Sequence, residues 1–381
     1  MARLGDIFEA QITGEWGNEC TENETGTKVL RTTNFTPDGI INFDNIVLRS
    51  ITESKVEKKR LHYGDIILEK SGGTEKIPVG RVVFCDKSIE DDTYLCNNFT
   101  QAMRVNQEVG CPRYVFYFMW YLHYSGKTDL LQNKTTGIRN LQVKSYLNEE
   151  IPLPSLEEQR HISATLDKVS DLIAKRRAQL DKLHLLVKAR FVEMTEDSET
   201  VLTRMGDVAT YINGYAFKPT NWSENGLPII RIQNLNNANA VYNYFDGVLP
   251  EKYLVRKGDV LVSWATHLEA YIWKGHDAWL NQHIFKVVFD KIPINDVYFV
   301  YSTEEALRQA FKNAHGFKPT MEHIKRSDFE DAVIQLPNVE VQNKFAKFAA
   351  QVDKSKLTIQ QSLDKLEILK KALMQQYFGD L

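Results

Sequence analysis

The chain has 381 residues, a net charge of −3, 43% hydrophobic residues and 25% charged residues, which is ordinary for a folded protein of two or three domains. This balance excludes a coat protein that binds nucleic acid without regard to sequence, but it allows a sequence reader with local basic patches. The longest apolar run, Tyr114 to Tyr124, is too short to cross a bilayer, and the N-terminal segment lacks the apolar core of a signal peptide.

The cysteines bear on the location of the protein. None of them forms a Cys-x-x-Cys pair, and all lie in the first half of the chain: Cys20, Cys85, Cys96 and Cys111. We therefore expect neither a metal site nor a disulfide framework, and a reducing cytoplasm fits this usage best.

Residues 1–154 are expected to form an irregular α+β domain. Short apolar runs bounded by Gly, Pro, Asn and Asp predict strands. These runs are 40–43, 65–68 and 81–84. Pro112 is a good first-turn residue and predicts a helix that continues to about Ser125. We expect the aromatic residues at 116–121 of this helix to fill the core rather than to stack on bases.

A long helix is predicted over residues 155–194. Ser155 precedes Glu158 by three residues, which is the spacing of a capping box at a helix N-terminus. Apolar residues then recur with the seven-residue period of a coiled coil. One row of this seam holds Leu166, Ile173, Leu180, Val187 and Met194, and the other holds Ile162, Val169, Arg176, Leu183 and Arg190. The segment 195–202, which is polar through Thr200, is expected to be a linker.

The second half of the chain repeats this plan. Residues 203–337 are expected to form another α+β domain, and residues 338–381 another long helix with Asn338 as its N-cap. The runs that predict strands are 228–232, 259–262 and 285–289. The seam rows of the helix are Phe345, Val352, Ile359, Leu366 and Leu373, and Ala349, Lys356, Leu363, Lys370 and Tyr377.

Short sequence marks indicate that the two halves are copies of one unit. Ile151-Pro152-Leu153-Pro154 with Gln159 returns as Ile334-Gln335-Leu336-Pro337 with Gln342, and the shift is 183 positions in both cases (334 − 151 and 342 − 159). Further pairs follow in the same order: Gly5-Asp6 and Gly206-Asp207, Arg31 with Asn34 and Arg231 with Asn234, and Gly64-Asp65 and Gly258-Asp259. A duplicated unit of about 185 residues predicts a pseudo-two-fold molecule, which suits two-fold targets such as duplex DNA.

The seams of the two helices are complementary. Where the first helix has Arg176 and Arg190, the second has Ile359 and Leu373. A helix of about 40 residues is about 60 Å long and cannot bury its seam on one domain of this size. We therefore expect the two helices to pair with each other as an antiparallel coiled coil that joins the domains. The alternative is that each helix packs only on its own domain.

This arrangement resembles the specificity (S) subunit of type I restriction-modification systems. The resemblance covers the whole chain and is carried by the helix entries Ile151–Gln159 and Ile334–Gln342, the long helices after them, and the Gly-Asp marks. It implies two target recognition domains, each reading one half of a bipartite, asymmetric DNA site. It also implies that the helices set the half-site spacing and dock two methyltransferase (modification) subunits, through which nuclease-translocase subunits join. S-adenosylmethionine is then expected on the methyltransferase subunits, and no cofactor on this chain.

Sequence motifs for catalysis are weak. The chain has no Pro-Pro for an Asn/Asp-Pro-Pro-Tyr methyltransferase loop, no GxxxxGK[S/T] phosphate loop and no HExxH motif. Asp38 with Glu53 and Lys55 spells a loose nuclease pattern, but Pro37-Asp38-Gly39 is typical of a turn, and the second half has no matching set. We expect no catalytic residue and no metal. The open alternatives are an enzyme with degenerate motifs (nuclease or DNA methyltransferase) and a coiled-coil adaptor without DNA binding.

Polar loops that contain glycine are the candidate DNA contacts, because their side chains reach base edges and phosphates and glycine allows close approach. The candidates in the first domain are Lys70, Ser71, Gly72, Gly73, Lys76, Arg81, Lys134, Thr135, Thr136, Arg139 and Asn140. Those in the second are Trp264, Thr266, His267, Tyr271, Lys274, His315 and Lys318. The alternative is that these are ordinary surface loops. Because the two sets differ, we expect the two half-sites to differ.

Overall fold

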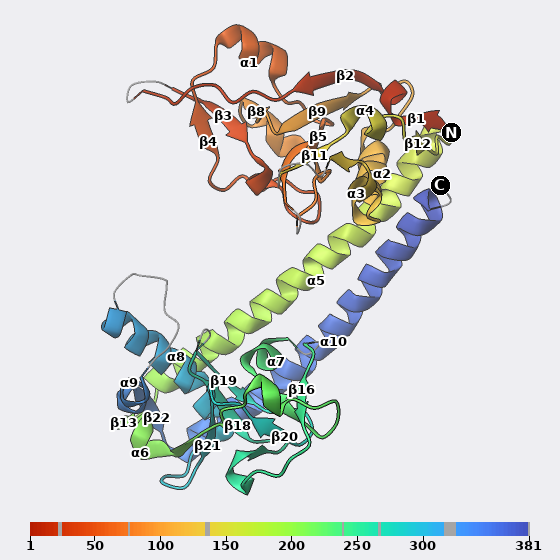
Figure 1. Cartoon of the computed structure of the whole chain (residues 1–381). Coiled ribbons are helices and arrows are strands. Elements are labelled where there is room, and N and C mark those ends of the chain that lie inside the picture. The colour runs from red at the N-terminus through yellow and green to blue at the C-terminus, as the bar shows by residue number, and fades with distance from the viewer. Residues whose placement is uncertain are drawn as a thin grey trace. The chain divides into compact units, whose positions relative to one another are not determined.

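The computed structural model describes residues 1–21, 25–74, 77–133, 138–237, 240–265, 268–315 and 325–379, with the backbone alone for Asn236 and residues 308–315. The chain divides into two compact units (Figure 1). Unit 1 comprises Met1–Lys175 and Ser362–Leu381, and unit 2 comprises Arg176–Gln361. Each unit therefore holds one α+β domain and a part of both long helices, α5 (Leu156–Glu196) and α10 (Val339–Phe378).

The described part of unit 1 contains several small sheets. Its strands are β1 (Ala2–Arg3), β2 (Phe8–Thr13), β3 (Thr27–Leu30), β4 (Val47–Arg49), β5 (Ile66–Glu69), β6 (Ser71–Gly73), β7 (Val82–Phe84), β8 (Tyr94–Cys96), β9 (Thr100–Val105), β10 (Gln132–Asn133), β11 (Arg139–Leu141) and β12 (Glu150–Ile151). The largest sheet is antiparallel, with the order β2-β9-β5-β7. In the second sheet β3 lies between antiparallel β4 and parallel β8. The other sheets are β10-β11-β6 and the pair β1-β12.

Helix α2 (Pro112–Tyr124) supplies the centre of the core of unit 1. Its buried residues are Tyr114, Val115, Phe116, Tyr117, Phe118, Met119, Tyr121 and Leu122. They pack against Ile66 and Met103 of the largest sheet and against Ile162 of α5. The predictions of the Pro112 start and of an aromatic core helix are both confirmed. The shorter helices of this unit are α1 (Glu53–Lys59), α3 (Lys127–Leu130), α4 (Val143–Tyr146), and the 3-10 turns η1 (Leu4–Ile7), η2 (Thr32–Asn34) and η3 (Lys87–Glu90).

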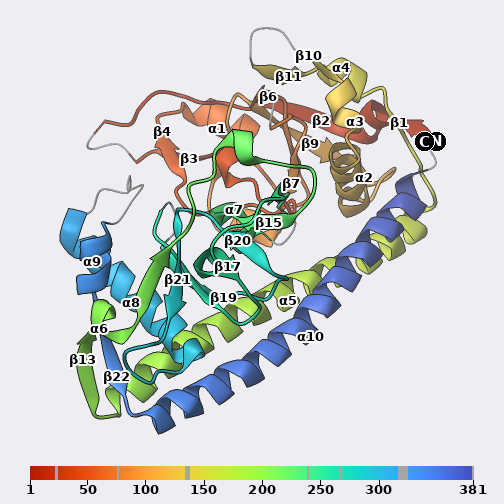
Figure 2. The ribbon, with the colours of Figure 1, turned by 60° about the horizontal axis from the view of Figure 1, so that its bottom comes forward.

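Unit 2 has a related set of sheets. Its strands are β13 (Thr200–Arg204), β14 (Thr210–Asn213), β15 (Leu227–Ile230), β16 (Asn243–Phe245), β17 (Leu254–Val255), β18 (Val260–Ser263), β19 (Glu269–Ile272), β20 (Ala278–Leu280), β21 (Ile284–Val288) and β22 (Val333–Pro337). One sheet has the antiparallel order β14-β21-β18-β19, and another has the order β16-β15-β20-β17 with β15 parallel to β20. Strands β13 and β22 form a separate pair (Figure 2). The remaining helices are α6 (Met205–Val208), α7 (Ile232–Asn236), α8 (Asp296–His315), α9 (Arg326–Asp331), η4 (Pro219–Asn221) and η5 (Glu251–Tyr253).

Hydrogen bonds of the repeated marks confirm the internal duplication. Asn34 is buried, and its side chain accepts the backbone N–H three residues before it at 2.9 Å. Asn234 is buried and does the same at 3.1 Å. Asp65 and Asp259 each accept the backbone N–H three residues before them, at 2.9 and 2.8 Å. Each mark therefore fixes an equivalent turn in both units.

Both long helices begin at the predicted caps. The hydroxyl of Ser155 accepts the backbone N–H of Glu158 at 3.3 Å, and the side chain of Asn338 accepts that of Val341 at 3.1 Å. Every predicted seam position is buried or half-buried. In each unit the segments of α5 and α10 run in opposite directions (Figure 1). Antiparallel pairing of the two helices is thus confirmed within each unit, although both helices also pack on the neighbouring domain.

Some predicted boundaries differ from the structure. Helix α5 continues to Glu196, because Thr195 is buried and donates its hydroxyl to the carbonyl of Phe191 at 2.7 Å. Strand β13 then begins at Thr200, so helix and strand share the segment predicted as a linker. The prediction of a strand at 40–43 is wrong, because this segment forms only an isolated bridge between Ile41 and Phe35. The carbonyl of Asn34 accepts the backbone N–H of Asn42, and the side-chain amide of Asn34 donates to the carbonyl of Asn42, so Asn34 takes up both backbone groups.

The other predicted strands lie within one or two residues of β5, β7, β15, β18 and β21. Within the described ranges, no helix is both long and apolar enough to span a bilayer.

Candidate nucleic-acid interface

Two predicted loops of the first domain come together in one sheet. Strand β11 pairs with β6, so that Arg139 lies opposite Gly73 and Asn140 opposite Ser71. The hydroxyl of Ser71 donates to the side-chain oxygen of Asn140 at 2.5 Å. These residues are far apart in the sequence, and the sheet makes them one surface.

The glycines in this surface have a steric reason. Gly72 has a φ of 95°, a left-handed conformation that side chains disfavour. A Cβ atom on Gly73 would lie 2.7 Å from Val79 Cγ1, which is too close for packing without a shift. Gly73 is buried, so its lack of a side chain lets β6 lie close to Val79, whereas Gly72 is exposed at the surface.

A third segment, which the sequence did not single out, completes this surface. The carbonyl of Phe99 accepts the backbone N–H groups of Lys70 at 2.9 Å and of Ser71 at 3.2 Å. Asn97 in the same turn donates its backbone N–H to the carbonyl of Leu30, the residue before Arg31. We call this surface loop face 1 and define it as Arg31, Lys70–Gly73, Asn97–Phe99 and Arg139–Asn140. Its charged side chains are all positive, which suits contact with phosphates.

Unit 2 repeats this arrangement with different side chains. Trp264 donates its backbone N–H to the carbonyl of His283 at 3.4 Å, as Lys70 does to Phe99. Asn281 donates to the carbonyl of Ile230, the residue before Arg231, at 3.3 Å. We define loop face 2 as Arg231–Gln233, Trp264–Ala265 and Asn281–His283. The repeated Arg-x-x-Asn mark was the sequence signal that could have located both faces.

Loop face 2 contains a small cavity of about 230 Å³. The residues that line it are Phe217, Trp222, Ile229, Arg231, Ile232, Gln233, Asn281, Gln282 and His283. The guanidinium of Arg231 lies 5.9 Å from the ring of Trp222 and donates to the side-chain oxygen of Asn243 at 3.1 Å. Gln233 is exposed and Gln282 half-exposed, so both can reach a partner outside the chain.

Arg81 was predicted as a DNA contact, but the structure places its guanidinium in an ion pair. It donates two hydrogen bonds of 2.8 Å to the carboxylate of Glu69, which is 3% exposed. This bidentate pair raises the pKa of Arg81. The geometry supports a structural role for Arg81 beneath loop face 1.

Substituting Glu69 by Gln tests this role. We expect Glu69→Gln to lower the free energy of unfolding by about 1.5–3 kcal/mol, because it weakens charge-assisted hydrogen bonds to a buried group. Urea denaturation measures the change. Glu57→Gln is the matched control, because Glu57 is exposed and its loss is expected to change stability by about 0.5 kcal/mol or less. Equal effects of the two substitutions would contradict a structural Arg81–Glu69 pair.

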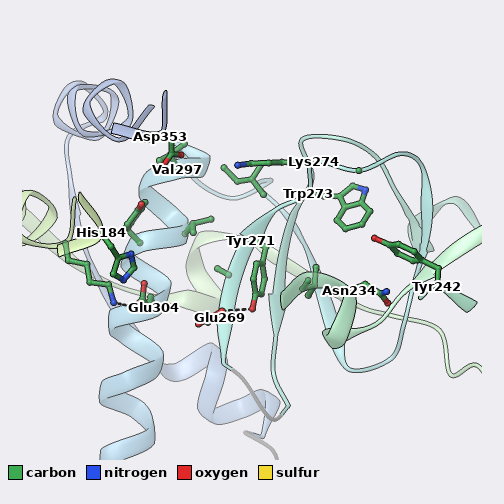
Figure 3. A pocket seen from close by; sticks show the side chains of 17 residues that line it. His184, Asn234, Tyr242, Glu269, Tyr271, Trp273, Lys274, Val297, Glu304 and Asp353 are labelled. Atoms are coloured by element: carbon green, nitrogen blue, oxygen red, sulfur yellow. Dashed lines mark hydrogen bonds and ion pairs between the residues drawn. The ribbon is translucent and has the colours of Figure 1, made fainter. Parts of the chain in front are cut away.

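Other predicted residues of the second domain lie apart from the small cavity. Tyr271 and Lys274 line a separate cavity of about 740 Å³, together with side chains of α5 and α8 (Figure 3). The hydroxyl of Tyr271 donates to Glu269 at 2.5 Å, and burial raises the pKa of this tyrosine. In the same cavity Lys188 pairs with Glu304 at 2.6 Å.

Among the remaining predicted positions, Trp264 contributes its backbone to loop face 2 while its ring packs on the core, and the side chains of the others are not described. The ring of Trp264 is half-buried and stacks 5.8 Å from that of Phe285. Outside the described residues lie Lys76, Lys134, Thr135, Thr136, Thr266, His267 and Lys318. His315 is the last residue of α8, and its side chain is not described.

The described side chains of the loop faces suit binding. Arginine and lysine can pair with phosphates, and arginine, asparagine and glutamine can form paired hydrogen bonds with base edges. Among the residues that the structure describes, no three His, Cys, Asp or Glu side chains are grouped to hold a metal ion.

Comparisons with known proteins give the same family twice along the chain. The family model for the type I restriction modification DNA specificity domain matches residues 1–183 and 197–368. The chain is 28% identical over 176 residues to the specificity subunit of the type I restriction enzyme EcoBI of Escherichia coli, a match that covers 45% of this chain and 36% of that one. It is 25% identical over 278 residues to the MjaVIII specificity subunit of Methanocaldococcus jannaschii, covering 64% of each. The matches thus span less than two thirds of either relative.

Solved structures agree at the level of the fold. The S subunit of a type I restriction-modification system from M. genitalium has a TM-score of 0.57 and 12% identity, with 100% of this chain and 96% of that chain covered. A chain from a study of the assembly and conformational transition of the type I R-M system has a TM-score of 0.55 and 17% identity, with 100% and 97% covered. Two tandem family matches cover most of the sequence, and the chain belongs to the family of type I restriction modification DNA specificity domains.

Proposed function

We propose that this chain is the sequence-specific DNA-recognition subunit of a type I restriction-modification complex. Each unit presents its loop face to one half of a bipartite, asymmetric DNA site. The long helices dock two methyltransferase subunits, and nuclease-translocase subunits join through these. The chain acts in the cytoplasm, where the DNA lies, and it performs no chemistry itself. S-adenosylmethionine binds to the partner methyltransferase subunits.

One observation carries this proposal: the same backbone frame occurs in both units with different side chains. Both frames join an Arg-x-x-Asn turn, the loop after β5 or β18, and the turn before β9 or β21. In the turn before β9, loop face 1 carries Asn98, and at the equivalent position in the turn before β21, loop face 2 carries Gln282. A duplicated frame with unlike side chains supports two related readers of unlike half-sites.

Selection from a library of random duplexes tests the proposal. The full chain is assembled with its methyltransferase subunits, and the bound DNA is sequenced. We expect two short preferred blocks that differ from each other and are separated by a fixed number of unread base pairs. A single continuous block, or no preferred sequence, would contradict a bipartite reader.

Two assays separate this proposal from the alternatives. The purified chain alone is incubated with duplex DNA and S-adenosylmethionine, and we expect neither methylation nor cleavage. Activity of the chain alone would support an enzyme with degenerate motifs. Absence of sequence-dependent DNA binding in the assembled complex would support a coiled-coil adaptor.

A further inference from the structure

A buried glutamine in the first turn of α5 joins this helix to the domain before it. Gln159 is 0% exposed. Its Oε1 accepts the backbone N–H of Cys111, the N-cap residue of α2, at 2.8 Å. Its Nε2 donates to the carbonyl of Pro154, at the end of the helix entry, at 2.9 Å. One side chain therefore holds the start of the long helix against the start of the main helix of the domain.

We call this connection between the long helix and the domain helix the joint, and unit 2 contains an equivalent one. Gln342 is 1% exposed, and its Oε1 accepts the backbone N–H of Asn295, which directly precedes α8, at 2.9 Å. Its Nε2 donates to the carbonyl of Pro337 at 2.8 Å. The same pair of hydrogen bonds therefore occurs in both halves of the chain, although much of the surrounding sequence differs between them.

A tyrosine adds a second hydrogen bond to each joint, donated from the domain helix to the segment before the long helix. Tyr114, in the first turn of α2, donates its hydroxyl to the carbonyl of Pro152 at 2.9 Å. Tyr298, in the first turn of α8, donates to the carbonyl of Gln335 at 2.7 Å. Burial raises the pKa of both phenols, so both stay protonated as donors at neutral pH. The domain helix is therefore bonded both to the first turn of the long helix, through the glutamine, and to the segment that leads into it, through the tyrosine.

These bonds restrict how a domain can turn about its long helix. Helix α2 is part of the same core as the largest sheet of unit 1, and β5 of that sheet leads directly into loop face 1. A rotation at the joint would carry the loop face with it. It would also leave buried N–H and C=O groups without partners, which is costly away from water.

We propose that Gln159 and Gln342 are positioning residues that lock each recognition domain to its long helix and so set the spacer accepted between the half-sites. This inference rests on the proposed function, because a spacer exists only for a bipartite reader. Neither glutamine touches DNA, since both are buried. Their loss should therefore change the accepted spacing and not the preferred bases.

The test compares two Gln→Met variants of the full chain in complex with its methyltransferase subunits. Gln342→Met removes both hydrogen bonds at similar side-chain volume, and Gln351→Met makes the same change at an exposed position of α10. Binding is measured to duplexes that keep both half-sites and shorten or lengthen the spacer by one base pair. For Gln342→Met we expect the preference for the native spacer to fall on the order of tenfold, with base preferences unchanged. The control should keep the native preference.

Tyr298→Phe provides a second variant if Gln342→Met does not fold. It removes one hydrogen bond and keeps the ring, so we expect a smaller loss of spacer preference in the same direction. A purely structural role would instead lower the affinity for all spacers by one common factor, and that result would overturn the inference. If the native complex binds no bipartite site, the proposed function fails; if it does and the variants keep the native spacer preference, only this inference fails.

Discussion

Replacing Phe378 by alanine is expected to lower the free energy of unfolding of unit 1 by about 3–5 kcal/mol. Phe378 is the last residue of α10 and is 1% exposed. Its ring lies 5.3 Å from that of Tyr114 and 5.8 Å from that of Phe118. Alanine would leave a cavity in a close-packed aromatic core, which surrounding side chains fill only in part. Urea denaturation followed by circular dichroism measures the loss.

Phe99→Ala is the matched control for this substitution. It removes the same atoms from a side chain that is 46% exposed on loop face 1, so we expect a change of about 0.5 kcal/mol or less. Equal losses for the two variants would mean that the end of α10 does not belong to the core of unit 1.

Replacing Arg139 by alanine is expected to weaken binding of the recognised DNA about 5- to 150-fold, which corresponds to about 1–3 kcal/mol. Arg139 is half-buried in β11, and its guanidinium has no hydrogen-bond or ion-pair partner among the described residues. It can therefore pair with a guanine edge or with a phosphate. Titration of duplexes with changes in each half-site separates the two cases. If Arg139 reads a base, its loss relaxes the base preference at one position of the site. If it contacts a phosphate, its loss weakens binding to all sequences evenly and reduces the slope of log binding constant against log salt concentration by about 1.

Two further variants make the Arg139 result specific. Arg81→Ala also removes an arginine, but one whose guanidinium is already bound to Glu69. We therefore expect this variant to lose stability and to keep its base preference. Gln233→Ala on loop face 2 should affect the other half-site. The assignment of one loop face to one half-site is wrong if Arg139→Ala changes the bases preferred in both half-sites.

Local signals in the sequence determined the duplication and the long helices. The caps Ser155 and Asn338 act on backbone groups three residues away, so their spacing is visible without a structure. The heptad rows depend on periodicity alone, and each predicted seam position is buried or half-buried. The strands were predicted from short apolar runs, and the failure at 40–43 came from a residue outside the run, Asn34.

The tertiary structure alone decided which side chains are available for binding. Arg81 and Arg139 are the same residue type in neighbouring polar segments, yet Glu69 holds only the first. Ser71 and Asn140 meet across 69 positions, and Gln159 reaches Cys111 across 48. Such contacts depend on how the whole domain closes its loops and packs its core, and no local period or cap encodes them. Sequence therefore determined the elements and their repetition, whereas long-range packing determined the surfaces that they present.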